Sequence, residues 1–297
     1  MTASSTRRGF LGGGAALAAG TFLAPSAGAR AESTRSGYRL RLSMAAYSYR
    51  NVLGGGADKA TMTIEQFIDL CADLRLDATE LTSYYIYKAG PAYMHELKAR
   101  AFRKGVAVSG TSVGNNFCLP LGTALDKQLA DLRQWVDNAV EMGAPHIRVF
   151  AGKAGGQREE DYKRMIAAMK QAVEYAGSRG VFLGIENHGY LTETAADVLR
   201  IVKDVPSPWF GVNLDTGNFK DDGYAQIAAL VPKAINVQVK TLVSEGGQRR
   251  PADVPRIFSV LREAGYHGYV ALEYEDKEDP KTGVPKFLEK MHAAAVG

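Results

Sequence analysis

Short apolar runs of strand length alternate with longer amphipathic segments along most of this chain. Such runs are typical of buried strands, and apolar positions three and four apart are typical of the helices that cover them. Helices are expected, for example, over residues 124–142 and 161–178, with Gly143 and Gly180 as the glycines that commonly end a helix. Strands are expected at residues 40–48, 78–84, 106–113, 146–151, 182–187, 210–215, 235–240 and 269–274.

Eight strand–helix units in a row predict an α/β fold, a single parallel (β/α)8 TIM barrel. Residues 32–297, about 266 residues, suit one such barrel and leave little room for a second domain. An open doubly wound sheet has the same alternation of elements. However, no glycine-rich phosphate-binding motif follows the first expected strand. We therefore expect one barrel domain over residues 32–297.

The first 31 residues differ in composition from the rest of the chain. Arg7 and Arg8 precede a short Gly/Ala-rich apolar run, and Ala29-Arg30-Ala31 offers a cleavage site. Twin arginines before such a run are typical of a Tat signal peptide. The run is too short for a stable membrane anchor, which takes about 20 apolar residues. We expect a periplasmic or secreted protein; a disordered basic tail or an uncleaved anchor is the alternative.

Charge and cysteine content narrow the function classes. The three basic residues of the first 31 have no acidic counterpart, so the remainder carries 33 basic and 32 acidic side chains, a net charge of +1. A nearly neutral domain lacks the overall positive charge that is typical of nucleic-acid-binding domains. The chain has two cysteines, Cys71 and Cys118. Two free thiols are favoured over a disulfide, which export would permit.

Oxygen-bearing side chains stand at the ends of four successive expected strands. They are Glu186, Asp215, Gln238 and Glu273, separated by 29, 23 and 35 residues, which is about one strand–helix unit each. The C-terminal ends of parallel barrel strands meet on one face, and oxygen ligands suit hard or borderline divalent cations. The four residues therefore predict one divalent metal ion and, with it, a metal-assisted isomerisation of a sugar.

The alternation of side chains along each strand supports this prediction. Burying many charged and polar groups without partners is costly, and a bound cation removes much of that cost. A set of salt-bridged barrel acids is the alternative. The residues expected to face inward are Gly184, Glu186, His188, Asn213, Asp215, Asn236, Gln238, Lys240, Ala271, Glu273 and Glu275.

The motifs at residues 184–188, 214–218, 237–240 and 272–273 resemble those of the xylose-isomerase-like sugar isomerases and epimerases of the TIM-barrel class. That family includes ketose 3-epimerases, inositol-catabolism enzymes and hydroxypyruvate isomerases. The resemblance covers essentially the whole chain after residue 31. It implies that Glu186, Asp215, Gln238 and Glu273 bind one divalent cation. Gln238 stands where histidine is usual and shifts the preference from zinc towards manganese or magnesium, so Mn, Mg, Co and Zn all remain candidates.

The resemblance also implies a mechanism. In the epimerases the two ligand glutamates act as base and acid, here Glu186 and Glu273, and move a proton next to a carbonyl through an enediolate. Arg148, His188 and Lys240 are candidates for binding the substrate, with internal ion pairs as the alternative. No glycine-rich phosphate cradle is evident at the strand ends, so a non-phosphorylated sugar or keto-sugar is expected.

Other functions remain open at the level of the sequence. A lyase or hydrolase of keto-glycosides would use the same site and the same proton abstraction. An exported sugar-binding barrel without turnover is the non-enzymatic alternative, with Gln238 as the mark of lost activity. A hydrolase of the apurinic-endonuclease kind would need more histidines for its several metals. The expected partner is a small-molecule sugar, and the sequence leaves a homo-oligomer open.

Overall fold

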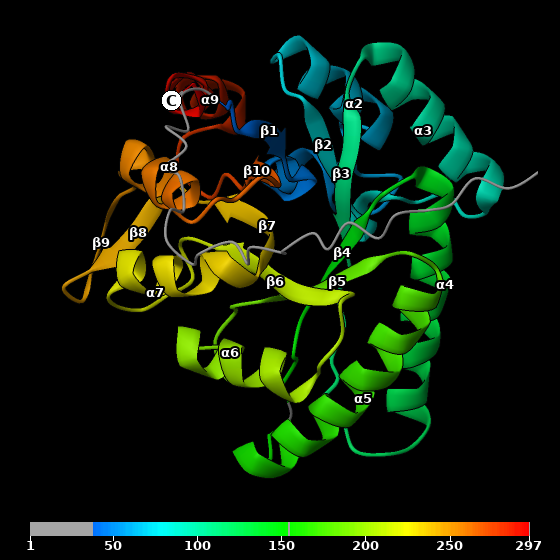
Figure 1. The fold of residues 1–297 in the computed structure, drawn as a ribbon. Helices are drawn as coiled ribbons and strands as arrows, with labels where there is room; N and C mark the ends of the chain where they lie inside the picture. The colour runs from blue at the N-terminus through cyan, green and yellow to red at the C-terminus, as the bar shows by residue number, and fades with distance from the viewer. Residues whose placement is uncertain (1–37, 154, 297) are drawn as a thin grey trace, which may run out of the picture. The chain divides into compact units, whose positions relative to one another are not determined.

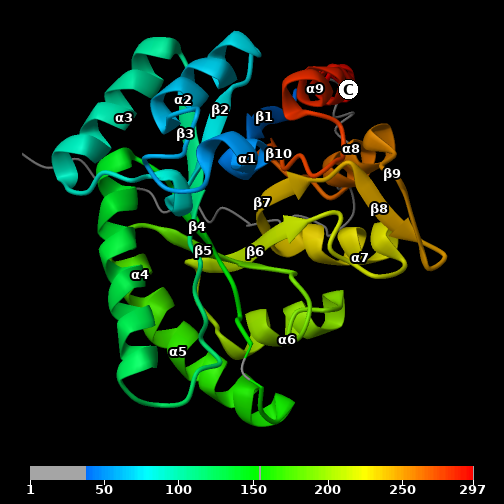
Figure 2. The ribbon, with the colours of Figure 1, turned by 180° about the vertical axis from the view of Figure 1, so that it is seen from behind.

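The computed structural model describes residues 38–153 and 155–296, in which eight parallel strands form a barrel surrounded by helices (Figures 1 and 2). The predicted signal peptide, residues 1–31, lies outside the described residues. The barrel strands are β1 (Arg41–Met44), β2 (Ala78–Thr82), β3 (Ala107–Ser112), β4 (His146–Val149), β5 (Phe182–Glu186), β6 (Phe210–Asp215), β7 (Ala234–Val239) and β10 (Tyr269–Leu272).

Neighbouring strands pair in the order β1-β10-β7-β6-β5-β4-β3-β2. A parallel bridge between Ala45 and Glu80 then brings β1 to β2 and closes the ring. The predicted (β/α)8 barrel is confirmed, and the open doubly wound sheet is excluded. Several strands end earlier than expected. In the run 40–48, for example, β1 ends at Met44 and, after the bridge at Ala45, the chain continues as a buried 3-10 turn, which an apolar pattern alone does not distinguish from a strand.

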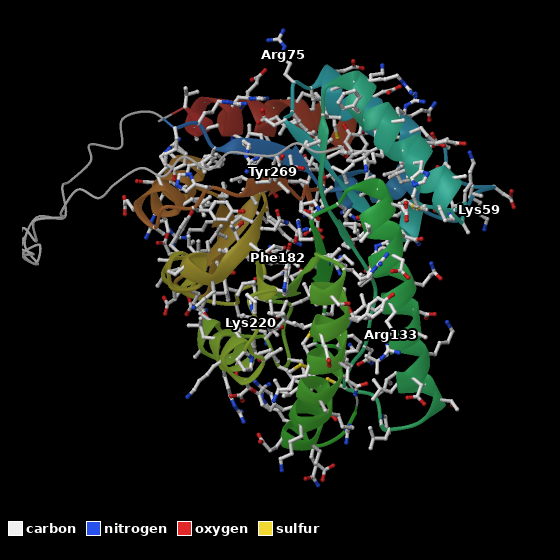
Figure 3. All side chains as sticks on the ribbon, turned by 45° about the vertical axis from the view of Figure 1, so that its right-hand side comes forward. Lys59, Arg75, Arg133, Phe182, Lys220 and Tyr269 are labelled. Carbon is white, nitrogen blue, oxygen red and sulfur yellow. The ribbon has the colours of Figure 1, made fainter. Side chains whose placement is uncertain are left out.

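Helices cover the outside of the barrel, and charged side chains such as Arg75 and Arg133 point away from it (Figure 3). No helix in the described residues is both long and apolar enough to cross a membrane. The main helices are α2 (Ile64–Asp73), α3 (Pro91–Lys104), α4 (Thr123–Met142), α5 (Arg158–Ser178), α6 (Ala195–Asp204), α7 (Gly223–Leu230), α8 (Val254–Glu263) and α9 (Pro280–Ala295). Shorter turns are η1 (Ala46–Tyr49), α1 (Arg50–Leu53), η2 (Ser83–Tyr85) and η3 (Val231–Lys233).

Local sequence explains where these helices begin and end. Thr63 and Thr194 cap α2 and α6 with reciprocal side-chain and backbone hydrogen bonds. Gly143 ends α4 at a φ of 74°, and Gly180 lies just beyond α5 at 73°, as predicted. Both cysteines are buried free thiols, as predicted.

The interior of the barrel is polar at its centre. Ser43 and Ser109 share a hydrogen bond of 2.7 Å, and the backbone oxygen of Ser109 lies 2.9 Å from Nδ1 of His146. Burial lowers the pKa of His146 to about 4, so this imidazole is neutral. Its ring fits only because residue 110 is glycine, since a Cβ there would lie 2.0 Å from the ring. His146 therefore belongs to the barrel core.

The segment that follows the seventh barrel strand is a β-hairpin. Strands β8 (Leu242–Glu245) and β9 (Gln248–Pro251) pair antiparallel. Gly246 and Gly247 join them with φ values of 59° and 70°, which a two-residue turn of this twist requires. The hairpin extends from the C-terminal end of β7, on the face where the site lies.

Candidate active site

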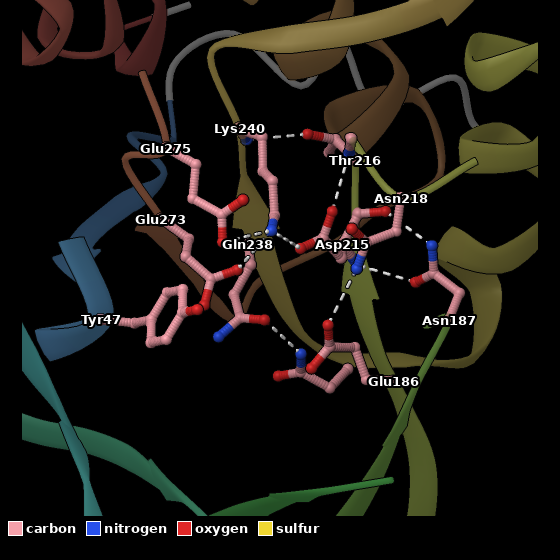
Figure 4. Close-up of polar contacts among 12 residues, drawn as sticks. Tyr47, Glu186, Asn187, Asp215, Thr216, Asn218, Gln238, Lys240, Glu273 and Glu275 are labelled. Carbon is pink, nitrogen blue, oxygen red and sulfur yellow. Dashed lines mark hydrogen bonds and ion pairs between the residues drawn. The ribbon is translucent and has the colours of Figure 1, made fainter. Parts of the chain in front are cut away.

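Three carboxylates meet where strands β5, β6 and β10 end (Figure 4). Glu186 is the last residue of β5, Asp215 is the last residue of β6, and Glu273 follows β10 directly. One oxygen from each of them lies within 4.8 Å of the others. All three side chains are buried. The parallel arrangement thus brings together three of the four residues that the sequence singled out as metal ligands.

The fourth residue, Gln238, is held in a buried polar network. Its Nε2 donates to Oε1 of Glu80 at 2.6 Å, and its Oε1 accepts from Nδ2 of Asn213 at 2.6 Å. Nδ2 of Asn236 donates to both Glu80 and Asn213, at 2.8 Å each. These bonds fix the direction of the Gln238 amide. A carbonyl oxygen has two lone pairs, so Oε1 of Gln238 keeps one for a further partner.

Lys240, just beyond β7, places its ammonium among carboxylates. Nζ lies 3.3 Å from Oδ2 of Asp215, 3.1 Å from Oε2 of Glu273 and 3.1 Å from Oε1 of Glu275. The structure therefore gives Lys240 the ion pair with Glu273 that the sequence offered as an alternative to substrate binding.

Arg148 on β4 makes the second buried ion pair, because its Nε lies 3.0 Å from Oε2 of Glu186. Nδ2 of Asn218 donates to the other oxygen, Oε1, at 2.9 Å. Both oxygens of Glu186 are thus held in place. Asn218 was not predicted as a site residue, although it belongs to the same LDTGN motif as Asp215.

The segments that follow β5 and β6 both fix Asp215. Nδ2 of Asn187 donates to the backbone oxygen of Asp215 at 2.8 Å, and Oδ1 of Asn187 accepts from its backbone nitrogen at 2.9 Å. The backbone nitrogen of Gly217 donates to Oδ1 of Asp215 at 2.8 Å. Oδ2 is buried, and among residues 38–153 and 155–296 it has no hydrogen-bond partner. Oδ2 is therefore held by a charge contact with Lys240 rather than by a hydrogen bond.

His188 lies at the rim of the site, exposed rather than buried. Its ring centre is 4.7 Å from that of Phe150, on which the Arg148 guanidinium also packs at 4.0 Å. A cavity of about 190 Å³ lies between the loops after β3, β4 and β5, and Asn115, Phe150 and His188 are among its lining residues. Glu186, Asp215 and Glu273 are not among its lining residues, and Arg148, which packs on Phe150 and pairs with Glu186, connects the cavity to the carboxylates.

The electrostatics of the site are dominated by burial and mutual repulsion of the acids. Burial raises the pKa of Asp215 well above its usual range, opposed by Lys240 and reinforced by Glu273 and Glu186. Burial also raises the pKa of Glu186, against the attraction of Arg148. For Glu273 burial acts in the same direction, but Lys240 and Arg148 outweigh it and the pKa is lowered.

Negative groups outnumber positive ones in this region. Burial, together with the charge of Glu273, raises the pKa of Glu80 to about 7. The carboxylates are Glu80, Glu186, Asp215, Glu273 and Glu275, and the cations in contact with them are Arg148 and Lys240. Four of these carboxylates are buried and Glu275 is partly exposed, and such an excess of acids favours binding of a further positive charge.

Comparisons with known proteins agree with this architecture. The chain is 26% identical over 184 residues to the 2-oxo-tetronate isomerase of Haemophilus influenzae. The aligned region covers 56% of this chain and 70% of the isomerase. A xylose isomerase domain protein from Planctomyces limnophilus superposes with a TM-score of 0.68 at 15% identity, over 88% of this chain and 97% of the other. D-psicose 3-epimerase from Clostridium cellulolyticum H10 superposes with a TM-score of 0.68 at 18% identity, over 86% of this chain and 96% of the epimerase.

These solved structures share the barrel fold with this chain over nearly its whole described length. The family model described as xylose isomerase-like TIM barrel matches residues 68–293, which is more than half of the sequence and includes β5, β6, β7 and β10. The resemblance inferred from the strand-end motifs is confirmed by this match, and the chain belongs to the xylose isomerase-like TIM barrel family.

Proposed function

We propose that this protein is a divalent-metal-dependent sugar isomerase or epimerase. The observation that carries the proposal is the meeting of Glu186, Asp215 and Glu273 at the C-terminal face of the barrel, where catalytic sites of this fold lie. The similarity to 2-oxo-tetronate isomerase supports a sugar-type substrate.

The residues present fit a divalent cation. Glu186, Asp215 and Glu273 would hold it, and the remaining lone pair on Oε1 of Gln238 would add a fourth oxygen. Oδ2 of Asp215, which has a charge contact with Lys240 but no hydrogen bond among the described residues, and the excess of buried acids both favour a cation. An all-oxygen set suits manganese or magnesium better than zinc. When bound, the ion would stabilise negative charge that develops on the carbonyl and hydroxyl oxygens of the substrate.

The chain's own groups would move the proton. Glu186 and Glu273 come from β5 and β10, with β6 and β7 between them, so their carboxylates reach the substrate from two directions. One would take the proton from the carbon next to the carbonyl. The other would return a proton to the neighbouring carbon in an isomerisation, or to the opposite face of the same carbon in an epimerisation. Arg148 and Asn218 hold Glu186, so this carboxylate is oriented before substrate arrives.

The cavity beside His188 favours a second candidate, a lyase or hydrolase of keto-glycosides. It would accommodate the part of a glycoside that extends beyond the reacting sugar. Incubating the manganese-loaded protein with ketoses, 2-oxo sugar acids and keto-glycosides, followed by product analysis, separates the two. We expect conversion of a free sugar or sugar acid into an isomer of the same mass, abolished by a chelator. Release of a second fragment would favour the glycoside activity, and no reaction together with no stoichiometric metal would contradict both.

We further propose that residues 1–31 direct Tat export to the periplasm or beyond. Because the twin arginines are the recognised feature, Arg7→Lys with Arg8→Lys is expected to leave the precursor in the cytoplasm. The measurement is the fraction of mature protein in the periplasm. Arg30→Lys is the matched control, since it preserves charge in the same segment and should leave export unchanged. Undiminished export of the double variant would contradict the assignment.

A further inference from the structure

Lys240 is the one buried lysine that contacts two of the proposed metal ligands in the part of the chain that is described. Its ammonium also contacts Glu275, which is not a proposed ligand. The side chains of Asp215 and Glu273 are 0% and 6% exposed, whereas that of Glu275 is 35% exposed. Lys240 therefore lies between the buried ligands and a more exposed carboxylate (Figure 4).

The inner part of Lys240 is fixed by the loop after β6. Its backbone nitrogen donates to Oγ1 of Thr216 at 3.0 Å. Residue 217 must be glycine at this contact, because a Cβ there would lie 2.7 Å from Cβ of Lys240. The outer methylenes of the side chain carry the ammonium and can rotate among staggered conformations. Movement of the charge is thus confined to a short swing between the neighbouring carboxylates.

A divalent ion held by Asp215 and Glu273 would share these carboxylates with the ammonium. Two positive charges separated by a few ångströms repel each other strongly in a buried site, where water screens them poorly. Ion and ammonium therefore compete for the same two carboxylates. Glu275 offers the ammonium a partner that the ion does not use.

We propose that Lys240 sets the metal affinity of this site by competing with the ion for Asp215 and Glu273, and that Glu275 holds its ammonium when the ion is bound. The inference rests on the proposed function, because it requires a metal at the three carboxylates. It assigns Lys240 a positioning role towards the ligands. If Lys240 only oriented the carboxylates, removing its charge would weaken metal binding. Competition predicts that removing its charge strengthens metal binding.

Titration of chelator-treated protein with Mn²⁺ in a calorimeter shows whether removing the Lys240 charge strengthens or weakens metal binding. Lys240→Met keeps the length of the side chain and removes its charge, and we expect its Kd for Mn²⁺ to fall by about tenfold or more. Lys220→Met is the matched control. Lys220 lies in the loop after β6 and is 77% exposed (Figure 3), so its Kd should stay within about twofold of wild type, because exposed charges are screened.

A double-mutant cycle tests the role of Glu275. Glu275→Gln removes one negative charge and should weaken Mn²⁺ binding in the wild-type background. Because the ammonium is absent from Lys240→Met, the same substitution should have a clearly smaller effect there. Equal effects in both backgrounds would overturn the part assigned to Glu275.

A crystal structure of the wild-type protein with Mn²⁺ provides a readout that does not depend on any variant folding. Nζ of Lys240 should contact Glu275 and should no longer contact at least one of Asp215 and Glu273. Nζ within 4 Å of both, beside a bound ion, would overturn the inference, as would unchanged or weaker binding by Lys240→Met. Wild-type protein that binds no Mn²⁺ at all would instead contradict the proposed function.

Discussion

Glutamine in place of Glu186 or Glu273 is expected to lower kcat by about 10²–10⁴-fold at saturating Mn²⁺, while the barrel stays folded. An amide oxygen can still bind a cation, but an amide cannot accept or deliver the proton that isomerisation moves. Each substitution keeps the size of the side chain, so packing around β5 and β10 is preserved. The measurement is kcat on the sugar identified by product analysis, with the Mn²⁺ content determined on the same sample.

Glu263→Gln is the control for this pair of variants. Glu263 is an exposed carboxylate at the end of α8, where it accepts a hydrogen bond from Ser259, and the change should leave kcat as it is in wild type. Near-wild-type activity of either Glu186→Gln or Glu273→Gln would show that the residue neither takes nor gives the proton.

Asp215→Ala is expected to abolish stoichiometric Mn²⁺ binding and, with it, turnover. Asp215 provides one of the three converging carboxylates, and its backbone is fixed by Asn187, so no neighbouring group can take its place. Metal content after dialysis, together with a calorimetric titration, measures the effect. Asp276→Ala removes an exposed acid just beyond Glu275 and should keep one ion per chain. Tight binding of one ion by Asp215→Ala would place the metal elsewhere.

The fold was predictable because each barrel strand carries its own local signal. An apolar run followed by an amphipathic segment identifies a strand–helix unit without knowledge of its neighbours. Strand ends were less predictable, since apolar residues such as Ala46 and Tyr49 continue into buried turns. The hairpin β8–β9 was missed, although Gly246-Gly247 between polar residues is a turn signal.

The meeting of Glu186, Asp215 and Glu273 followed from strand-end position, because parallel strands end on one face. The hydrogen-bond partners of Gln238 could not be predicted from strand-end position. Glu80 lies 158 residues away on β2, and its contact depends on the closure and register of the whole barrel. The supporting roles of Asn187 and Asn218 were missed for a similar reason: short polar residues after strands are common, and only the fold selects the ones that touch Asp215 and Glu186.

Hydrogen exchange at carbon tests the central claim most directly. The manganese-loaded protein is incubated in heavy water with each ketose, 2-oxo sugar acid and keto-glycoside, and the recovered sugars are analysed for deuterium. The account predicts deuterium at the carbon next to the carbonyl of one sugar class. The label should be absent with chelator and at least about 10²-fold slower to appear with Glu186→Gln. No deuterium in any sugar, from protein that carries one Mn²⁺ per chain, would contradict proton abstraction at this site.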